Sequence, residues 1–123
     1  MPKHAEMIVI DRTYELVRWY LGHLTKFPRC HRYGLGARLE NKLYGVLEGL
    51  VEARYSREPA RQALLARANA ELQAVRTLTR LAHELAFLSH KSHEYAAREL
   101  VEIGSMVGGW SKQQPSTRTS SSA

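Results

Sequence analysis

Apolar residues recur at alternating spacings of three and four along most of this chain. This is the period of one face of an α-helix, whereas a strand shows a period of two. The first such stripe predicts a helix over residues 7–24 that ends near Lys26, because Pro28 disfavours helical geometry at the residue before it. Its apolar positions are Met7, Ile10, Tyr14, Val17, Leu21 and Leu24.

A second stripe follows a basic segment that contains glycine. It predicts a helix that starts between Arg32 and Leu35 and ends near Arg54. Gly45 and Gly49 lie within it, and each glycine costs about 1 kcal/mol of helix propensity relative to alanine. We therefore expect the backbone of a neighbouring helix, of this chain or of another, to approach closely there. The buried face is expected to comprise Leu35, Leu39, Leu43, Val46, Leu47 and Leu50.

Two further stripes predict a third helix over residues 59–88 and a fourth that Gly108 and Gly109 close. Ser56 and Ser92 are the expected polar caps, and Pro59 suits a first helical turn, where its missing N–H does no harm. The stripes consist of Leu64, Ala68, Leu72, Val75, Leu78, Ala82 and Leu85, and of Ala96, Leu100, Ile103, Val107 and Trp110.

Four helices with short connections, and no strand pattern, predict an all-α fold: an up-down-up-down four-helix bundle. We expect the bundle domain to span residues 1–110. Residues 111–123 are polar and low in complexity, so we expect a disordered tail. The large aromatic residues are expected in the core or at an interface. They are Tyr14, Trp19, Tyr20, Tyr44 and Trp110.

The bulk composition narrows the class of protein. The chain has 123 residues, enough for one domain, and its formal charge of +6 favours an anionic partner, with nucleic acid first and an acidic protein surface second. Cys30 is the only cysteine, which excludes an intrachain disulfide and fits a reducing cytoplasm. The first 24 residues carry frequent charges, so we expect no signal peptide, no membrane span and a cytoplasmic location.

The most basic part of the chain is KFPRCHRYGLGARLE, residues 26–40, which has no acidic residue before Glu40. Arginine donates to phosphate through a planar fork, and His31 or Tyr33 could stack on an unpaired base. The alternative is an ordinary solvated loop beside a helix start. We interpret the segment as an anion-binding surface. Its cations are Lys26, Arg29, Arg32 and Arg38.

A second basic row lies in the predicted third helix, where Arg76 and Arg80 are four residues apart. Like charges at this spacing repel by a few tenths of a kcal/mol, so a binding role would explain them, although a solvated face with Glu71 and Glu84 is an equal alternative. Other arginines near the second connection are mixed with acids, which favours a solvated surface there. They are Arg54, Arg57, Arg61 and Arg67.

No catalytic, metal-binding or cofactor-binding set emerges. Gly34-x-Gly36 follows no strand and lacks the remainder of a phosphate-loop motif. Cys30 and His31 are adjacent in a loop, where two side chains rarely point at one another. The histidines of the last connection lack the repeated Glu-x-x-His pairs of di-iron bundles, so the sequence predicts no enzyme and no cofactor. These histidines are His83, His90 and His93.

Four stretches resemble a known family in order and in content. They are KFPRCHRYGLGARLE (26–40), LEGLVEAR (47–54), LTRLAHEL (78–85) and YAARELVEIGSMVGGW (95–110). The chain resembles the accessory variability determinant (Avd) proteins of diversity-generating retroelements, which are related to the four-helix proteins encoded in 23S ribosomal RNA intervening sequences.

This resemblance implies a protomer of a barrel-like homopentamer that binds a reverse transcriptase and template-repeat RNA, together with DNA or cDNA. Such a protein supports mutagenic cDNA synthesis and retrohoming, while the polymerase active site belongs to the partner. The resemblance assigns binding of nucleic acid or partner to Lys26, Arg29, Arg32, Arg38, Arg76 and Arg80. The alternatives are an intervening-sequence-type protein, or a basic protein-interaction module, without a reverse transcriptase partner.

Overall fold

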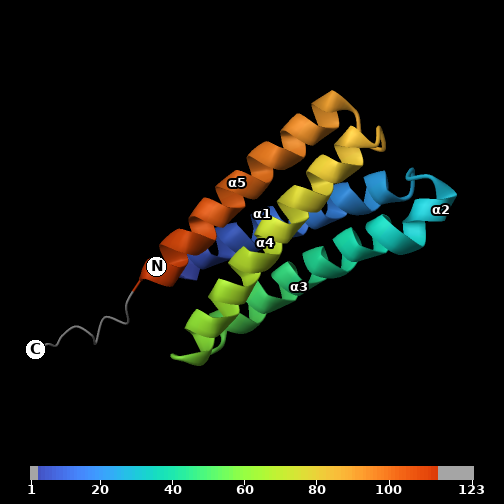
Figure 1. Cartoon of the computed structure of the whole chain (residues 1–123). Coiled ribbons are helices and arrows are strands. Elements are labelled where there is room, and N and C mark those ends of the chain that lie inside the picture. Colours follow the sequence, from blue (N-terminus) through green and yellow to red (C-terminus); the bar gives the residue numbers. More distant parts are fainter. Residues whose placement is uncertain (1–2, 114–123) are drawn as a thin grey trace, which may run out of the picture.

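The computed structural model describes residues 3–113 as a bundle of four long helices: α1 (Lys3–Leu24), α3 (Ala37–Arg54), α4 (Ala60–Glu84) and α5 (His90–Lys112). Short α2 (Arg29–His31) and a π-helical turn, η1 (Arg32–Gly36), join α1 to α3. The long helices run alternately up and down, and each packs against two neighbours in the order α1, α3, α4, α5 (Figure 1). The predicted all-α four-helix bundle is confirmed. The predicted tail of residues 111–123 starts too early, because α5 continues to Lys112. From residue 114 on, the tail lies outside the described residues.

The core forms where the apolar faces of the four helices meet. The predicted stripe of α5 is buried throughout, and that of α3 is buried or half-buried. One polar contact crosses the core: the Tyr20 hydroxyl lies 2.6 Å from Thr79 Oγ1, which itself donates to the Val75 carbonyl. Tyr20 is therefore the donor, and burial raises the pKa of its phenol. A satisfied hydroxyl pair of this kind can be buried without a large desolvation penalty.

The buried face of α1 is broader than its predicted stripe. Since α1 packs against both α3 and α5, its core face centres on Val9, Thr13 and Leu16, and the predicted stripe marks only one edge. Tyr14 lies beyond that edge and is 51% exposed, so it is not a core residue, and a place at an interface stays a prediction for it. Among the other aromatic residues Tyr20 and Trp110 are buried, whereas Trp19 and Tyr44 are half-buried.

Both predicted serine caps are wrong. Ser56 Oγ donates to the Glu52 carbonyl at the end of α3, so this hydroxyl does not cap α4, which begins at Ala60. Ser89 is the N-cap of α5, since its Oγ accepts from the Ser92 N–H at 3.0 Å. Each of these hydroxyls bonds to a backbone group at a helix end, and sequence spacing alone does not say which group that will be.

The glycine pair near the end of α5 does not close the helix. The helix continues through Gly108 and Gly109 to Lys112, because contacts with α4 hold its last turn. Trp110 is buried, Gln62 Nε2 donates to the Ser111 carbonyl at 2.8 Å, and Ser111 Oγ donates to Gln62 Oε1 at 2.9 Å. Tertiary contacts here outweigh the low helix propensity of glycine.

The third helix ends four residues earlier than predicted. At Ala86 the backbone enters the left-handed region with φ of 66°, which terminates α4 at Glu84 and leaves Leu85 half-exposed. The Phe87 N–H donates to the Ala82 carbonyl at 2.8 Å, and the Ala86 N–H donates to the His83 carbonyl at 2.9 Å. This pair of bonds is a Schellman motif. Its left-handed residue, here Ala86, is at a position that favours glycine over alanine.

The substitution Ala86→Gly is therefore expected to raise the free energy of unfolding by about 1 kcal/mol, because glycine adopts the left-handed region without a Cβ clash. Ala70→Gly, at an exposed position inside α4, should lower it by about 1 kcal/mol. Urea denaturation of both variants checks the pair. A loss of stability in Ala86→Gly would contradict the assigned helix end.

The two glycines of α3 differ in their surroundings. A Cβ at Gly45 would lie 2.8 Å from Glu71 Oε1 of α4, so the space at this glycine is taken by a side chain, and the predicted close approach of a neighbouring helix backbone is wrong within the described chain. A Cβ at Gly49 would have no described atom within 4 Å. Gly45 thus has a packing role within the protomer, whereas Gly49 faces open space.

Candidate nucleic-acid interface

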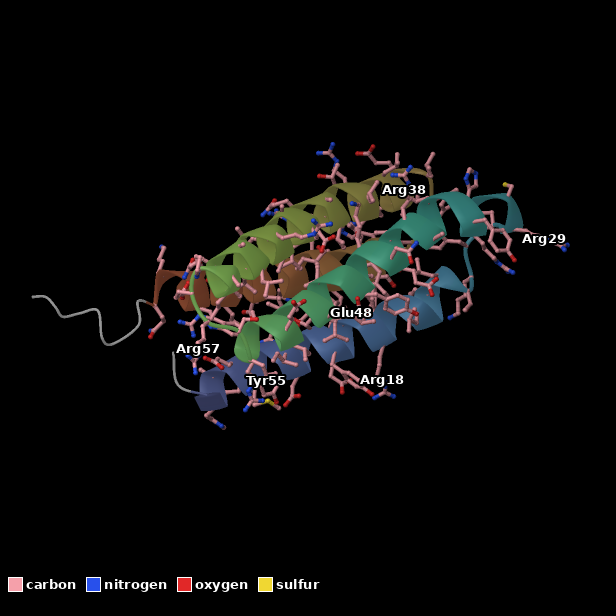
Figure 2. The ribbon with its side chains drawn as sticks, turned by 90° about the horizontal axis from the view of Figure 1, so that it is seen from below. Arg18, Arg29, Arg38, Glu48, Tyr55 and Arg57 are labelled. Carbon is pink, nitrogen blue, oxygen red and sulfur yellow. The ribbon has the colours of Figure 1, made fainter. Side chains whose placement is uncertain are left out.

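The four cations Lys26, Arg29, Arg32 and Arg38, here called the basic segment, lie at the end of the bundle where α1 connects to α3. All four side chains are exposed. Figure 2 shows Arg29 at the tip of this end and Arg57 near the opposite end. The basic segment therefore forms part of the end surface of a rigid bundle.

Phe27 fixes this connection to the core. Its side chain is 1% exposed and its ring centroid lies 5.5 Å from that of Phe87, which follows α4. The Phe27 N–H closes the end of α1 by donating to the Leu24 carbonyl at 3.1 Å. This buried anchor between Lys26 and Arg29 holds the two flanking charged side chains at the surface.

The glycines of η1 lie in the turn that enters α3, and neither has a positive φ. Gly36 is buried, and a Cβ there would lie 3.4 Å from the His31 carbonyl oxygen, which is a close contact but not a clash. Helical turns already begin at Arg29, while α3 proper begins at Ala37, slightly after its predicted start. The Gly34-x-Gly36 pattern is thus explained by a helix entry.

Within the described residues, the cations of the basic segment have no acidic partner. Between residues 3 and 113, no carboxylate forms an ion pair with any of its four members. Arg32 Nε donates to the Phe27 carbonyl at 3.1 Å, which leaves its terminal nitrogens available. Beside them the Tyr33 side chain is 90% exposed, although an aromatic ring is usually placed where it can pack. Cations and an exposed ring together suit a phosphate backbone with unpaired bases.

A hollow of about 420 Å³ lies next to Tyr33 and Arg38. Asn41 and Lys42, three and four residues after Arg38, line it and were missed by the sequence interpretation. Their spacing from Arg38 was the available signal, because residues three and four apart share a helix face. Lys42 extends the cationic surface along α3.

Arg76 and Arg80 lie elsewhere, in a groove of about 390 Å³ between α4 and α5. The structure therefore does not place all six predicted cations on one face. Both sets nevertheless lie toward the same end of the bundle, because the α4–α5 connection is at the end that carries α2 (Figure 1). The His31 ring, 4.8 Å from the Phe87 ring, links the two connections directly.

The groove includes residues that the sequence interpretation did not assign to binding. Gln73 and Thr77 line it from α4, and His93 lines it from α5. Arg76 Nη1 donates to Gln73 Oε1 at 3.4 Å, and Arg80 lies 3.8 Å from Glu84 in an exposed and therefore weak pair. The four-residue spacings 73–77 and 76–80 indicate that these side chains share one face of α4. That α5 packs beside this face is known only from the fold.

Three histidines gather beside this groove. The His83 and His93 rings stack with centroids 4.4 Å apart and planes 14° apart, and the His83 and His90 centroids are 5.6 Å apart. Stacked rings do not aim their nitrogens at a common point, and the described residues contain no group of His, Cys, Asp and Glu suited to a metal ion. Partial burial, and then the charges of His83 and His90, lower the pKa of His93.

Several arginines away from this end are paired. Arg61 Nη2 lies 2.8 Å from Glu58, and Arg12 Nη2 lies 3.0 Å from Glu99 and 2.5 Å from Glu102. The hydrogen bond to Glu102, and then that to Glu99, raises the pKa of Arg12. These pairs contrast with the basic segment, although exposed Arg57 and Arg98 also have no ion pair within the described chain.

No described helix combines the length and apolar character needed to span a lipid bilayer.

Comparisons with known proteins cover nearly the whole bundle. A family model described as bAvd-like matches residues 7–114. The crystal structure of a protein with unknown function from the S23 ribosomal protein family, from Bacteroides thetaiotaomicron VPI-5482, superimposes with a TM-score of 0.82 and 12% identity. That alignment covers 89% of this chain and 99% of that chain, and at this identity it shows a shared fold alone. No curated protein sequence matches.

Proposed function

This chain belongs to the bAvd-like family, and we propose that it is the accessory scaffold of a diversity-generating retroelement, binding template RNA and the reverse transcriptase through its basic end. The single observation that carries this proposal is the basic segment: four exposed cations, on the end of a rigid bundle, with no carboxylate partner among the described residues. Such a surface favours phosphate without reading base sequence.

The proposed mechanism is multivalent. A few phosphate contacts from one protomer bind weakly, whereas a homopentamer repeats them around an axis and raises the overall avidity without new contacts. Rigid placement also limits the side-chain and loop ordering required on binding. The scaffold would thereby hold RNA close to the polymerase during mutagenic cDNA synthesis and retrohoming, in the cytoplasm.

The proposed role is non-enzymatic. The reverse transcriptase supplies the polymerase active site, and this chain supplies position and charge. Its Arg and Lys side chains would neutralise phosphates along the RNA, while Tyr33 offers a ring on which an unpaired base could stack. Some of the cations would meet the transcriptase instead of the RNA.

Native mass spectrometry of the chain alone, with template RNA, and with RNA-free reverse transcriptase tests this proposal. We expect the mass of a homopentamer, and a complex with each partner. A complex with the transcriptase that excludes RNA would instead identify a protein-interaction module. A chain that binds neither partner would match the intervening-sequence alternative.

A further inference from the structure

The groove between α4 and α5 has the form of a small anion site. Arg76 and Arg80 line it from α4, and His93 lines it from α5. Arg76 has no carboxylate partner within residues 3–113, so its guanidinium can donate to a ligand as a planar fork. The floor consists of Thr79, Ala97 and Leu100, of which Thr79 and Leu100 are buried in the core.

Polar groups complete the walls. Gln73 and Thr77 place an amide and a hydroxyl on the same face of α4 as the two arginines. The Thr77 hydroxyl donates to the Gln73 carbonyl at 3.2 Å, which leaves its oxygen able to accept but not to donate. The donors open to an anion are therefore the two guanidinium groups, the Gln73 amide and the His93 ring, which gains a second N–H and a positive charge on protonation.

The charged groups around His93 come from both helices that form the groove. His83 of α4 stacks on it, and His90 of α5 lies beside His83. Partial burial, and then the charges of these two histidines, lower the pKa of His93 and outweigh the opposing effect of Glu94 and Glu84. From α1, His23 approaches only as far as Ser92, with 3.4 Å between its Nε2 and Ser92 Oγ.

We propose that this groove binds one phosphodiester of an RNA chain between Arg76, Arg80 and His93, and that proton uptake at His93 strengthens the binding as the pH falls. This inference rests on the proposed RNA-binding function and adds to it a defined subsite and a form of regulation. The two arginines repel one another in the free protein, and an anion between them and α5 relieves that repulsion.

The direction of the pH effect follows from linkage. In free protein His93 is neutral at pH 7, because its pKa lies below the ordinary value. A phosphodiester beside the ring favours the imidazolium, so the pKa of His93 is higher in the complex. Affinity therefore rises as the pH falls through the bound-state pKa, by at most about tenfold per pH unit for one proton, and levels off below the free-state pKa.

Binding of a fluorescent oligouridylate, measured by anisotropy between about pH 5.5 and 8 at constant ionic strength, tests the inference. Neither uracil nor a phosphodiester titrates in this range, so the pH dependence belongs to the protein. We expect the wild-type affinity to rise roughly three- to tenfold toward low pH. His93→Gln should abolish most of that rise. His4→Gln is the matched control, because His4 is exposed at the start of α1, does not line the groove, has no effect on the pKa of His93 and should leave the rise in place.

A rise in His93→Gln equal to that of the wild type would overturn the inference, as would unchanged affinity in Arg76→Gln/Arg80→Gln. Nuclear magnetic resonance of the wild-type His93 ring needs no variant, and its pKa must increase when oligouridylate binds. RNA binding that shows no pH dependence would remove this inference and leave the proposed function intact. Absence of RNA binding at every pH would remove both.

Discussion

Replacing Arg29 and Arg38 by glutamate is expected to lower the affinity for single-stranded RNA by at least about 25-fold at roughly 0.1 M salt. Each phosphate contact contributes about −0.7 to the slope of log K against log salt. A slope of about −0.7 corresponds to an affinity about fivefold higher at 0.1 M than at 1 M salt. Two lost contacts multiply to about 25-fold, and the introduced carboxylates add repulsion. Neither arginine makes a side-chain hydrogen bond to the described part of the chain, so the fold should be unaffected.

The matched control is Arg18→Glu/Arg57→Glu, which changes the net charge by the same amount. Figure 2 shows Arg18 on the side of the bundle and Arg57 near the end opposite Arg29. Both residues are exposed, and the Arg18–Glu15 pair at 3.6 Å is weak. We expect the control variant to lose less than about threefold in RNA affinity, because only the long-range electrostatic field at the basic segment changes. Equal losses in the two double variants, measured by anisotropy, would show that RNA responds to net charge alone.

The second large effect concerns the fold. Trp110→Ala is expected to lower the free energy of unfolding by about 3–5 kcal/mol, because it leaves a cavity of tryptophan size in the core. Trp110 is 1% exposed and lies in the last turn of α5, beyond the glycine pair. Its indole Nε1 has no hydrogen-bond partner in the described chain, so its stabilising effect comes from packing alone.

Val101→Ala provides the comparison on the same helix, since Val101 is 49% exposed and its truncation should lower the free energy of unfolding by less than about 1 kcal/mol. Urea denaturation measures both variants. A loss below about 1 kcal/mol for Trp110→Ala would mean that the last turn of α5 is not packed. The helix would then end at Gly108 and Gly109, as the sequence pattern predicts.

The four helices were predictable because burial imposes their apolar spacing. Their ends were not, because local groups compete there and tertiary contacts decide the outcome. Ser89 caps α5 in place of Ser92, and Ala86 takes a conformation usually left to glycine. The last turn of α5 persists because Trp110 is buried and Gln62 bonds to Ser111. The helix propensities of single residues describe none of these contacts.

The candidate site was predictable to the extent that it depends on a continuous run of charge. A stretch with no acidic residue has few local partners, and the structure places its cations at the surface. The second site depends on two helices. Arg76 and His93 are 17 residues apart and line one groove only because α4 and α5 are antiparallel neighbours. Periodicity within one helix carries no information on such a partner.

The claim that the basic end binds the phosphate backbone is tested most directly by the salt dependence of wild-type RNA affinity. If all four cations of the basic segment contact phosphates, log K should fall against log salt with a slope of about −3 per protomer engaged. The measurement is anisotropy of a labelled template RNA over roughly 0.05 to 0.5 M salt. A slope near zero, with binding retained, would contradict the claim.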